Sequence, residues 1–222
     1  MKKILFVLTN NNKLGNTNKE TGFYLPEVAH PYEILKNSFK IEFASILGGK
    51  APISGLESIS SDSVSKKFYE NHSDFYKNTK KLNSLNYADY DAIFFAGGHG
   101  TMWDFPKNKD ISNAIVTIYE KGGVIASVCH GPAALVDVKL SNGKYLLSNK
   151  KFTSFTNAEE EAINYTNIVP LLLETALINN GGIFEKADLW KKKVVVDSRI
   201  ITGQNPASAY GVAEELKVLL EN

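Results

Sequence analysis

A single cysteine, Cys129, ends an apolar run and immediately precedes His130 and Gly131. Residues 123–128 predict a buried strand, and the segment from Gly131 predicts the start of a helix. A side chain at such a sharp turn projects from the sheet into a cleft, as in a nucleophile elbow. Since a helix N-terminus stabilises negative charge, we expect a lowered thiol pKa and a reactive thiolate. The alternative is that Cys129 is a small, inert core residue.

A glycine-rich segment at residues 97–100 also follows an apolar run. It does not match G-x-G-x-x-G, and the chain has no G-x-x-x-x-G-K-[ST], so nucleotide binding is weakly supported. One interpretation is a tight turn that needs glycine for its backbone. The other is that Gly98 presents its N–H to a developing oxyanion, together with the N–H of His130. We then expect Gly97 and His99 to line the same substrate pocket.

Several side chains are candidates for proton transfer. His130 is either the base that activates Cys129 or an orienting residue completed by a distant carboxylate. Glu27 precedes a helical segment, so it is either a carboxylate favourably placed in a first helical turn or a buried acid or base. Residues 159–161 are three glutamates, which by default form a solvated helix N-terminus. The four histidines form no H-x-x-x-H or H-E-x-x-H pattern, so the sequence predicts no metal site.

The composition indicates an ordinary globular protein. With 222 residues, 43% hydrophobic and 22% charged, the chain is expected to form one domain over residues 1–222. A net charge of +1 gives no indication of a nucleic-acid or membrane partner. The apolar run near the N-terminus is too short for a signal peptide or a bilayer span. A lone cysteine excludes an intrachain disulfide and fits a reducing cytoplasm.

Strand-like and helix-like segments alternate along the chain. This order predicts an α/β fold with a mostly parallel sheet covered on both faces and a site beyond the carboxyl ends of the strands. A small hairpin insertion is expected at residues 144–147 and 151–155. Strands are expected at residues 3–8, 40–45, 91–96, 123–128, 193–197 and 200–202. Helices are expected at residues 27–35 with Pro31 in the first turn, 63–82 as one helix or a pair, 111–119, from Asn157 as N-cap, 170–180 and 207–220.

Three segments together resemble the DJ-1/PfpI superfamily. They are residues 92–100, the segment Val128-Cys129-His130-Gly131-Pro132, and Leu25-Pro26-Glu27. Residues 202–208 extend the similarity to the Hsp31-like branch, the glutathione-independent glyoxalase III and stress-chaperone group. The resemblance implies a flavodoxin-like three-layer sandwich that presents the cysteine on a nucleophile elbow.

The resemblance also implies a site and an activity. Cys129 is then the nucleophile, Glu27 approaches the thiol, and His130 pairs with an acidic residue. Counted from Phe155, that residue is Glu160, with Glu159 one position away. The implied reaction converts methylglyoxal and similar 2-oxoaldehydes to lactate-type 2-hydroxy acids in a homodimer, without glutathione, nucleotide or metal. The added domain and metal site of the larger bacterial Hsp31 chaperones are not carried over.

Two other classes of function remain open. The first is a holding chaperone or redox sensor, in which an exposed thiol of low pKa reports oxidant. A chaperone also needs an exposed apolar patch, which the sequence does not locate. The second is a cysteine peptidase or amidohydrolase, which a Cys-His-Glu set suits formally. Loss of activity in a Cys129 variant and a comparison of methylglyoxal with casein separate these classes.

Overall fold

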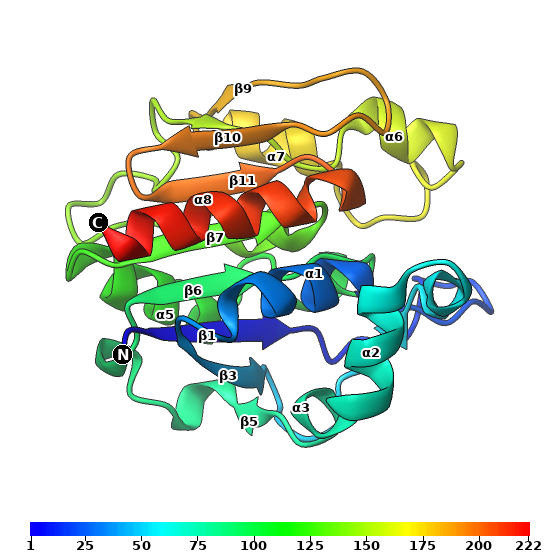
Figure 1. Cartoon of the computed structure of the whole chain (residues 1–222). Coiled ribbons are helices and arrows are strands. Elements are labelled where there is room, and N and C mark those ends of the chain that lie inside the picture. Colours follow the sequence, from blue (N-terminus) through cyan, green and yellow to red (C-terminus); the bar gives the residue numbers. More distant parts are fainter.

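The computed structural model describes residues 1–222, and its centre is a seven-stranded sheet (Figure 1). The strand order is β10-β11-β7-β6-β1-β3-β5, and every pair is parallel except β10 with β11. This confirms the predicted mostly parallel sheet. Its strands are β1 (Lys3–Leu8), β3 (Lys40–Ser45), β5 (Lys80–Lys81), β6 (Ala92–Phe95), β7 (Val124–Val128), β10 (Val194–Asp197) and β11 (Ile200–Gly203).

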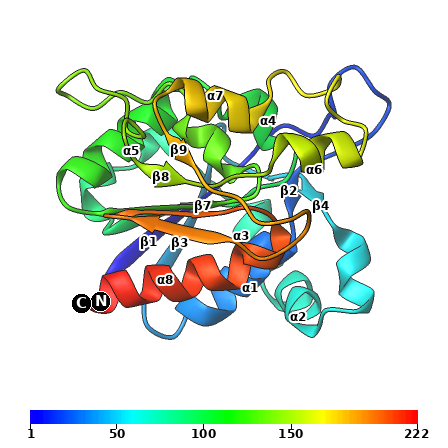
Figure 2. The ribbon, with the colours of Figure 1, turned by 90° about the horizontal axis from the view of Figure 1, so that it is seen from above.

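Helices cover both faces of the sheet, as Figure 2 shows. Along β1, Ile4, Phe6 and Leu8 belong to the core on the α1 and α8 face, whereas Leu5 and Val7 belong to the core on the α5 face. A strand buried on both faces explains the continuous apolar run. The helices are α1 (Pro26–Leu35), α2 (Ser63–Asn71), α3 (Ser73–Lys77), α4 (Thr101–Asp104), α5 (Lys109–Glu120), α6 (Asn157–Ala162), α7 (Leu173–Asn179) and α8 (Ala209–Glu221).

Shorter elements complete the chain. The polar segment at residues 63–82 contains the helix pair α2 and α3, as one of its two interpretations predicted. No helix is long and apolar enough to cross a bilayer. The small strands are β2 (Phe23–Tyr24), β4 (Ile53–Ser54), β8 (Lys151–Phe152) and β9 (Ile183–Phe184); the 3₁₀ helices are η1 (Leu56–Ser60), η2 (Leu82–Ser84), η3 (Tyr87–Asp89), η4 (Gly131–Leu135) and η5 (Pro206–Ser208).

The predicted hairpin insertion at residues 144–147 and 151–155 is wrong. Residues 144–147 form no strand, and β8 pairs in parallel with β9. Leu146 and Leu147 are neighbours, yet both are buried in the same core. In a strand they would point to opposite faces, so the apolar pair reflects a buried turn.

Two helix starts also differ from the predictions. The first helix begins at Pro26, and Pro31 lies in its interior. Proline removes one backbone donor there, but α1 packs along α8, and this tertiary contact compensates for the lost helical bond (Figure 1). The helix predicted to be capped by Asn157 is capped instead by Thr156.

Candidate active site

The turn after β7 presents Cys129 in a strained conformation. Its φ angle is +60°, in the left-handed region that residues other than glycine rarely adopt. The Cys129 N–H donates to the Gly203 carbonyl and its own carbonyl accepts from Phe155 N–H, each at 2.9 Å. A Cβ on Gly131 would collide with the Phe95 carbonyl, so glycine lets this turn approach β6 closely. The structure confirms the sharp strand-to-helix turn, although η4 is only a short 3₁₀ helix.

His130 contacts both the thiol and a carboxylate. Its Nδ1 lies 3.3 Å from Cys129 Sγ, and its Nε2 lies 2.8 Å from Glu160 Oε2. A neutral imidazole that donates its Nε2 proton to Glu160 leaves the Nδ1 lone pair facing the thiol. The sequence left open whether His130 is a base for Cys129 or a residue oriented by a distant carboxylate, and in the structure it contacts both groups.

Glu160, and not Glu159, faces His130. Burial works to raise the pKa of Glu160, but the hydrogen bonds from His130 and His99 prevail and hold it at about 2. Glu160 is therefore ionised at neutral pH. For His130, burial and the charge of His99 prevail over Glu160, which acts to raise the His130 pKa, and they lower that pKa to about 4. We therefore take His130 as the neutral member of the pair.

Glu159 is fully buried and connects three segments. Its Oε2 accepts the Thr156 N–H at 3.0 Å, and Thr156 Oγ1 accepts the Glu159 N–H at 2.9 Å, which forms a capping box. Its Oε1 accepts hydrogen bonds from Trp190 N–H, Gln204 Nε2 and Asn205 Nδ2 at 2.8–3.1 Å. The C-terminal motif at residues 202–208 therefore supports the helix that carries Glu160.

We expect Glu159→Ala to lower the free energy of unfolding by about 3 kcal/mol, because it leaves several buried donors without an acceptor. Urea unfolding measures this loss. The matched control is Glu161→Ala, on the exposed side of the same helix, which is expected to change stability by less than about 0.5 kcal/mol. Equal effects of the two substitutions would contradict the connecting role of Glu159.

Glu27 lies in the first turn of α1, with its side chain completely buried. Neither carboxyl oxygen has a partner within hydrogen-bond geometry. Burial raises the pKa of Glu27 to about 8, although the Cys129 thiol and the Gly97 backbone partly oppose the rise. Glu27 is thus mostly protonated at pH 7. A Cβ on Gly97 would collide with Glu27 Oε2, so this glycine makes room for the carboxyl group.

The expectation of a lowered thiol pKa is wrong. Cys129 is 4% exposed, and burial is the main cause that raises its pKa well above the usual value. The charge that Glu27 acquires above about pH 8 raises the thiol pKa further. The backbone N–H groups of His130 and Gly98 act on the sulfur in the opposite direction but are outweighed. The sequence pattern suggested a helix N-terminus but did not reveal how deeply the turn is buried.

Gly98 is the residue for which the sequence predicts an oxyanion-binding N–H. The Gly98 backbone, like that of His130, acts on the Cys129 sulfur in the direction that lowers its pKa. Its φ is +99°, and a Cβ would collide with the Gly22 carbonyl, so a side chain is excluded here. Two backbone groups thus favour negative charge at the sulfur, the atom at which chemistry would begin.

His99 contacts both members of the His130–Glu160 pair. Its Nε2 lies 2.9 Å from Glu160 Oε1, and its ring centroid is 4.0 Å from that of His130. The side chain is 19% exposed, which makes His99 the solvent-facing member of the group. No sequence pattern predicted this second histidine–carboxylate contact, because the two residues come from separate segments.

Aromatic rings that the sequence did not single out enclose the histidines. Phe155 lies 4.3 Å from His130 and Trp190 lies 5.7 Å from Phe155, measured between ring centroids. Tyr165 meets His99 edge-on at 5.1 Å. These rings restrict the movement of both imidazoles.

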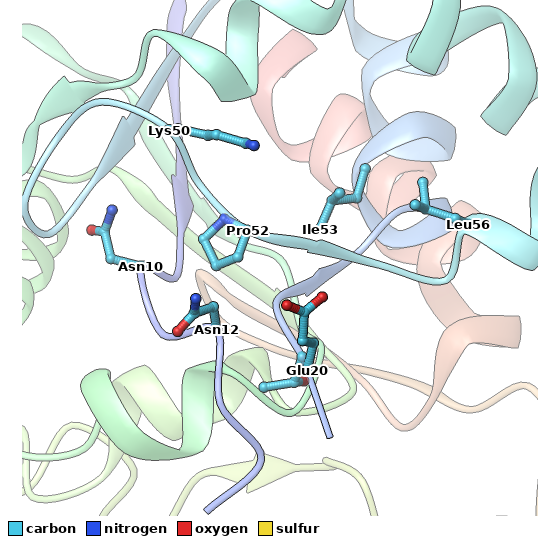
Figure 3. Close-up of a pocket in the computed structure, with 8 residues that line it drawn as sticks. Asn10, Asn12, Glu20, Lys50, Pro52, Ile53 and Leu56 are labelled. Atoms are coloured by element: carbon cyan, nitrogen blue, oxygen red, sulfur yellow. The ribbon is translucent and has the colours of Figure 1, made fainter. Parts of the chain in front are cut away.

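A separate polar cavity of about 420 Å³ lies beside β4, and Figure 3 shows Lys50 and Glu20 on opposite sides of Pro52. None of the candidate catalytic residues lines this cavity. Its lining residues are Asn10, Asn12, Glu20, Thr21, Lys50, Pro52, Ile53 and Leu56.

The sheet and the elbow define the class of the protein: a flavodoxin-like α/β sandwich with a cysteine at the carboxyl end of a central strand. The DJ-1/PfpI family matches residues 20–217, and the chain belongs to this family. It is 34% identical to Glyoxalase 3 of Candida albicans, over 100% of this chain and 99% of that protein. It is 32% identical to the glutathione-independent glyoxalase HSP31 of Saccharomyces cerevisiae, over 96% and 95%.

Solved structures agree with these relationships. The Rapid Encystment Protein 24 kDa of Francisella tularensis superposes with a TM-score of 0.96 at 42% identity, over 100% of both chains. Glyoxalase III of Candida albicans superposes with a TM-score of 0.90 at 31% identity, over 98% of this chain and 96% of that one. The resemblance to the DJ-1/PfpI family and its glyoxalase branch is confirmed.

Proposed function

We propose that the protein is a cofactor-independent enzyme of the glyoxalase III type, which converts methylglyoxal and similar 2-oxoaldehydes to 2-hydroxy acids such as lactate. The observation that carries this proposal is the position of Cys129 between a protonated Glu27 and the His130–Glu160 pair. Full-length similarity to proteins named glutathione-independent glyoxalases supports it.

In the first step the Cys129 sulfur bonds to the aldehyde carbon, C1, and the thiol proton moves to His130 Nδ1. Because the thiol pKa is raised, attack and proton transfer are coupled, and no thiolate accumulates beforehand. Glu160 stabilises the imidazolium. The N–H groups of Gly98 and His130 stabilise the alkoxide, which then takes the proton back from His130 and becomes a hemithioacetal.

In the second step neutral His130 removes the hydrogen of C1 as a proton, while Glu27 donates its proton to the C2 carbonyl oxygen. The product is an enediol. His130 then returns a proton to C2, and the C1 hydroxyl returns one to Glu27. C1 is oxidised to a thioester and C2 is reduced to an alcohol, so the step needs no external electron carrier.

Hydrolysis completes the cycle. A water oxygen bonds to C1 while His130 takes a proton from that water. The N–H groups of Gly98 and His130 again stabilise the alkoxide. The C1–sulfur bond breaks, and the proton returns to Cys129. One methylglyoxal and one water give one lactic acid.

The direct test incubates the purified protein with methylglyoxal and, in parallel, with casein. We expect lactate to form in equal amount to the methylglyoxal consumed, without glutathione and after dialysis against EDTA, and we expect casein to stay intact. Proton NMR and gel electrophoresis provide the two readouts. Cleavage of casein without lactate formation would favour the peptidase alternative and contradict this proposal.

The buried thiol of raised pKa does not favour the redox-sensor alternative, which needs an exposed thiolate. We further propose a single DJ-1/PfpI-type domain over residues 1–222, since the central sheet draws strands from both ends of the chain. We also propose that the protein is a homodimer and that it acts in the cytoplasm. Analytical ultracentrifugation tests the oligomeric state.

A further inference from the structure

We propose that His99, His130 and Glu160 form a binding site for a divalent transition-metal ion such as Zn²⁺, and that the bound ion switches the enzyme off. The ion would be an inhibitor and not a cofactor. Binding rests on the geometry of these three side chains alone. Inhibition rests, in addition, on the function proposed above.

The three ligand atoms are already close together. One ring nitrogen of His99, one ring nitrogen of His130 and a Glu160 carboxylate oxygen all lie within 4.8 Å of one another. At a tetrahedral zinc ion with bonds of about 2.0–2.1 Å, ligand atoms are roughly 3.4 Å apart. Both Nε2 atoms already point at the carboxylate, at 2.9 and 2.8 Å. A zinc ion would therefore take the place of the protons in these two contacts, with small side-chain movements.

The three side chains are held in place by burial and packing and do not form a loose surface cluster. His130 and Glu160 are buried, and the Phe155 and Tyr165 rings pack against the imidazoles. Because the His99 side chain is partly exposed, an ion can reach the three ligand atoms from solvent on the His99 side. Two imidazoles and one carboxylate are a ligand set that zinc accepts, with a fourth position left for water. The sequence prediction of no metal site rested on spacing along the chain, whereas these three side chains come from separate segments that the fold brings together.

Binding at Nε2 would change what His130 can do. A neutral imidazole bound to a metal through Nε2 must carry its proton on Nδ1. That N–H would then donate to Cys129 Sγ, 3.3 Å away, instead of accepting the thiol proton. In neutral His130 the proton only moves from Nε2 to Nδ1, so metal binding does not require the ring to lose a proton. The ion thus removes the base without touching the sulfur.

The binding test uses Cys129→Ala, because this variant has no thiol to bind metal. After dialysis against EDTA, calorimetric titration with zinc chloride is expected to show one ion per chain. Adding His99→Gln is expected to weaken binding at least tenfold. The matched control, His72→Gln in the same background, changes a half-buried histidine of an aromatic cluster and should leave binding unchanged. Thermal melts verify that all three variants are folded.

Two binding results would overturn the proposal. One is that Cys129→Ala loses zinc that the unmodified protein binds, which would make the thiol the ligand. The other is that His99→Gln binds as tightly as its parent. A ¹⁵N imidazole NMR spectrum of Cys129→Ala provides a second readout, because zinc should move the His130 proton signal from Nε2 to Nδ1. An unchanged tautomer with zinc bound would also contradict the site.

The inhibition test measures methylglyoxal turnover against free zinc. Each protein is compared with its own rate in EDTA. The concentration for half-inhibition is expected to rise at least tenfold in His99→Gln, and EDTA should restore the original rate. Equal sensitivity of the two proteins would overturn the inhibitory role. If the unmodified protein has no turnover at all, the proposed function fails, whereas the calorimetric result still decides the metal site.

Discussion

Cys129→Ala is expected to lower kcat/KM for methylglyoxal by at least about 10³-fold while leaving the protein folded. The sulfur makes the only covalent bond to substrate in the proposed cycle, so no neighbouring group replaces it. The fold should tolerate the change, because alanine adds no atoms to the turn. Turnover assays and urea unfolding measure the two effects.

Ser127→Ala is the matched control for this variant. Ser127 lies two residues earlier on β7, is buried, and its hydroxyl has no hydrogen-bond partner. We expect this substitution to leave turnover within about twofold and stability within about 1 kcal/mol. Retained turnover in pure Cys129→Ala would refute the role of the thiol. Loss in both variants would indicate damage to the strand instead.

Glu27→Gln is expected to lower kcat by about 10²–10⁴-fold, the usual contribution of a positioned acid–base group. Glutamine keeps a hydrogen-bond donor of similar shape but cannot transfer a proton to the C2 oxygen. Because Glu27 is needed in its protonated form, the unmodified enzyme should also lose activity as pH rises through about 8. A pH–rate profile measures this decline.

The same substitution has a predicted effect on stability. The pKa of Glu27 is about 8 in the folded protein, whereas in the unfolded chain it is about 4.5. This contribution to stability is fully present below pH 4.5 and is lost as pH rises to about 8. The gap corresponds to about 5 kcal/mol at 1.36 kcal/mol per unit. We therefore expect Glu27→Gln to be more stable than the unmodified protein at pH 8.

Urea unfolding at pH 5 and pH 8 tests this expectation. Glu33→Gln is the control, because Glu33 lies in the same helix but its hydrogen bond with Lys36 lowers its pKa. At pH 8 this control should lose up to about 1 kcal/mol. If the free energy of unfolding changes by the same amount between pH 5 and pH 8 in Glu27→Gln and in the unmodified protein, the claim that Glu27 is buried as a neutral carboxyl group is wrong.

Much of the fold could be predicted from local sequence. Runs such as residues 3–8 and 123–128 are apolar without alternation, which is typical of strands buried on both faces. The turn at Cys129 followed from the point at which such a run ends. The failures occurred where tertiary contacts override local rules: Pro31 inside α1, and Leu146 with Leu147 in a buried turn.

The candidate site was only partly predictable. The sequence could not separate Glu159 from Glu160, but consecutive helical residues point about 100° apart. One therefore faces His130 and the other faces Gln204. The raised thiol pKa could not be foreseen, because it depends on burial that no motif reports. The pairing of His99 with Glu160 likewise depends on the folded sheet.

The most direct test of the central claim is a crystal structure of Glu27→Gln soaked with methylglyoxal. In this variant the second step should be much slower than the first, so that the product of the first step accumulates, because the proton donor for the C2 oxygen is missing. We predict continuous electron density from Cys129 Sγ to the aldehyde carbon, with the C1 oxygen within hydrogen-bond distance of the Gly98 and His130 N–H groups. Density for methylglyoxal at another residue, with a free thiol at Cys129, would contradict the account.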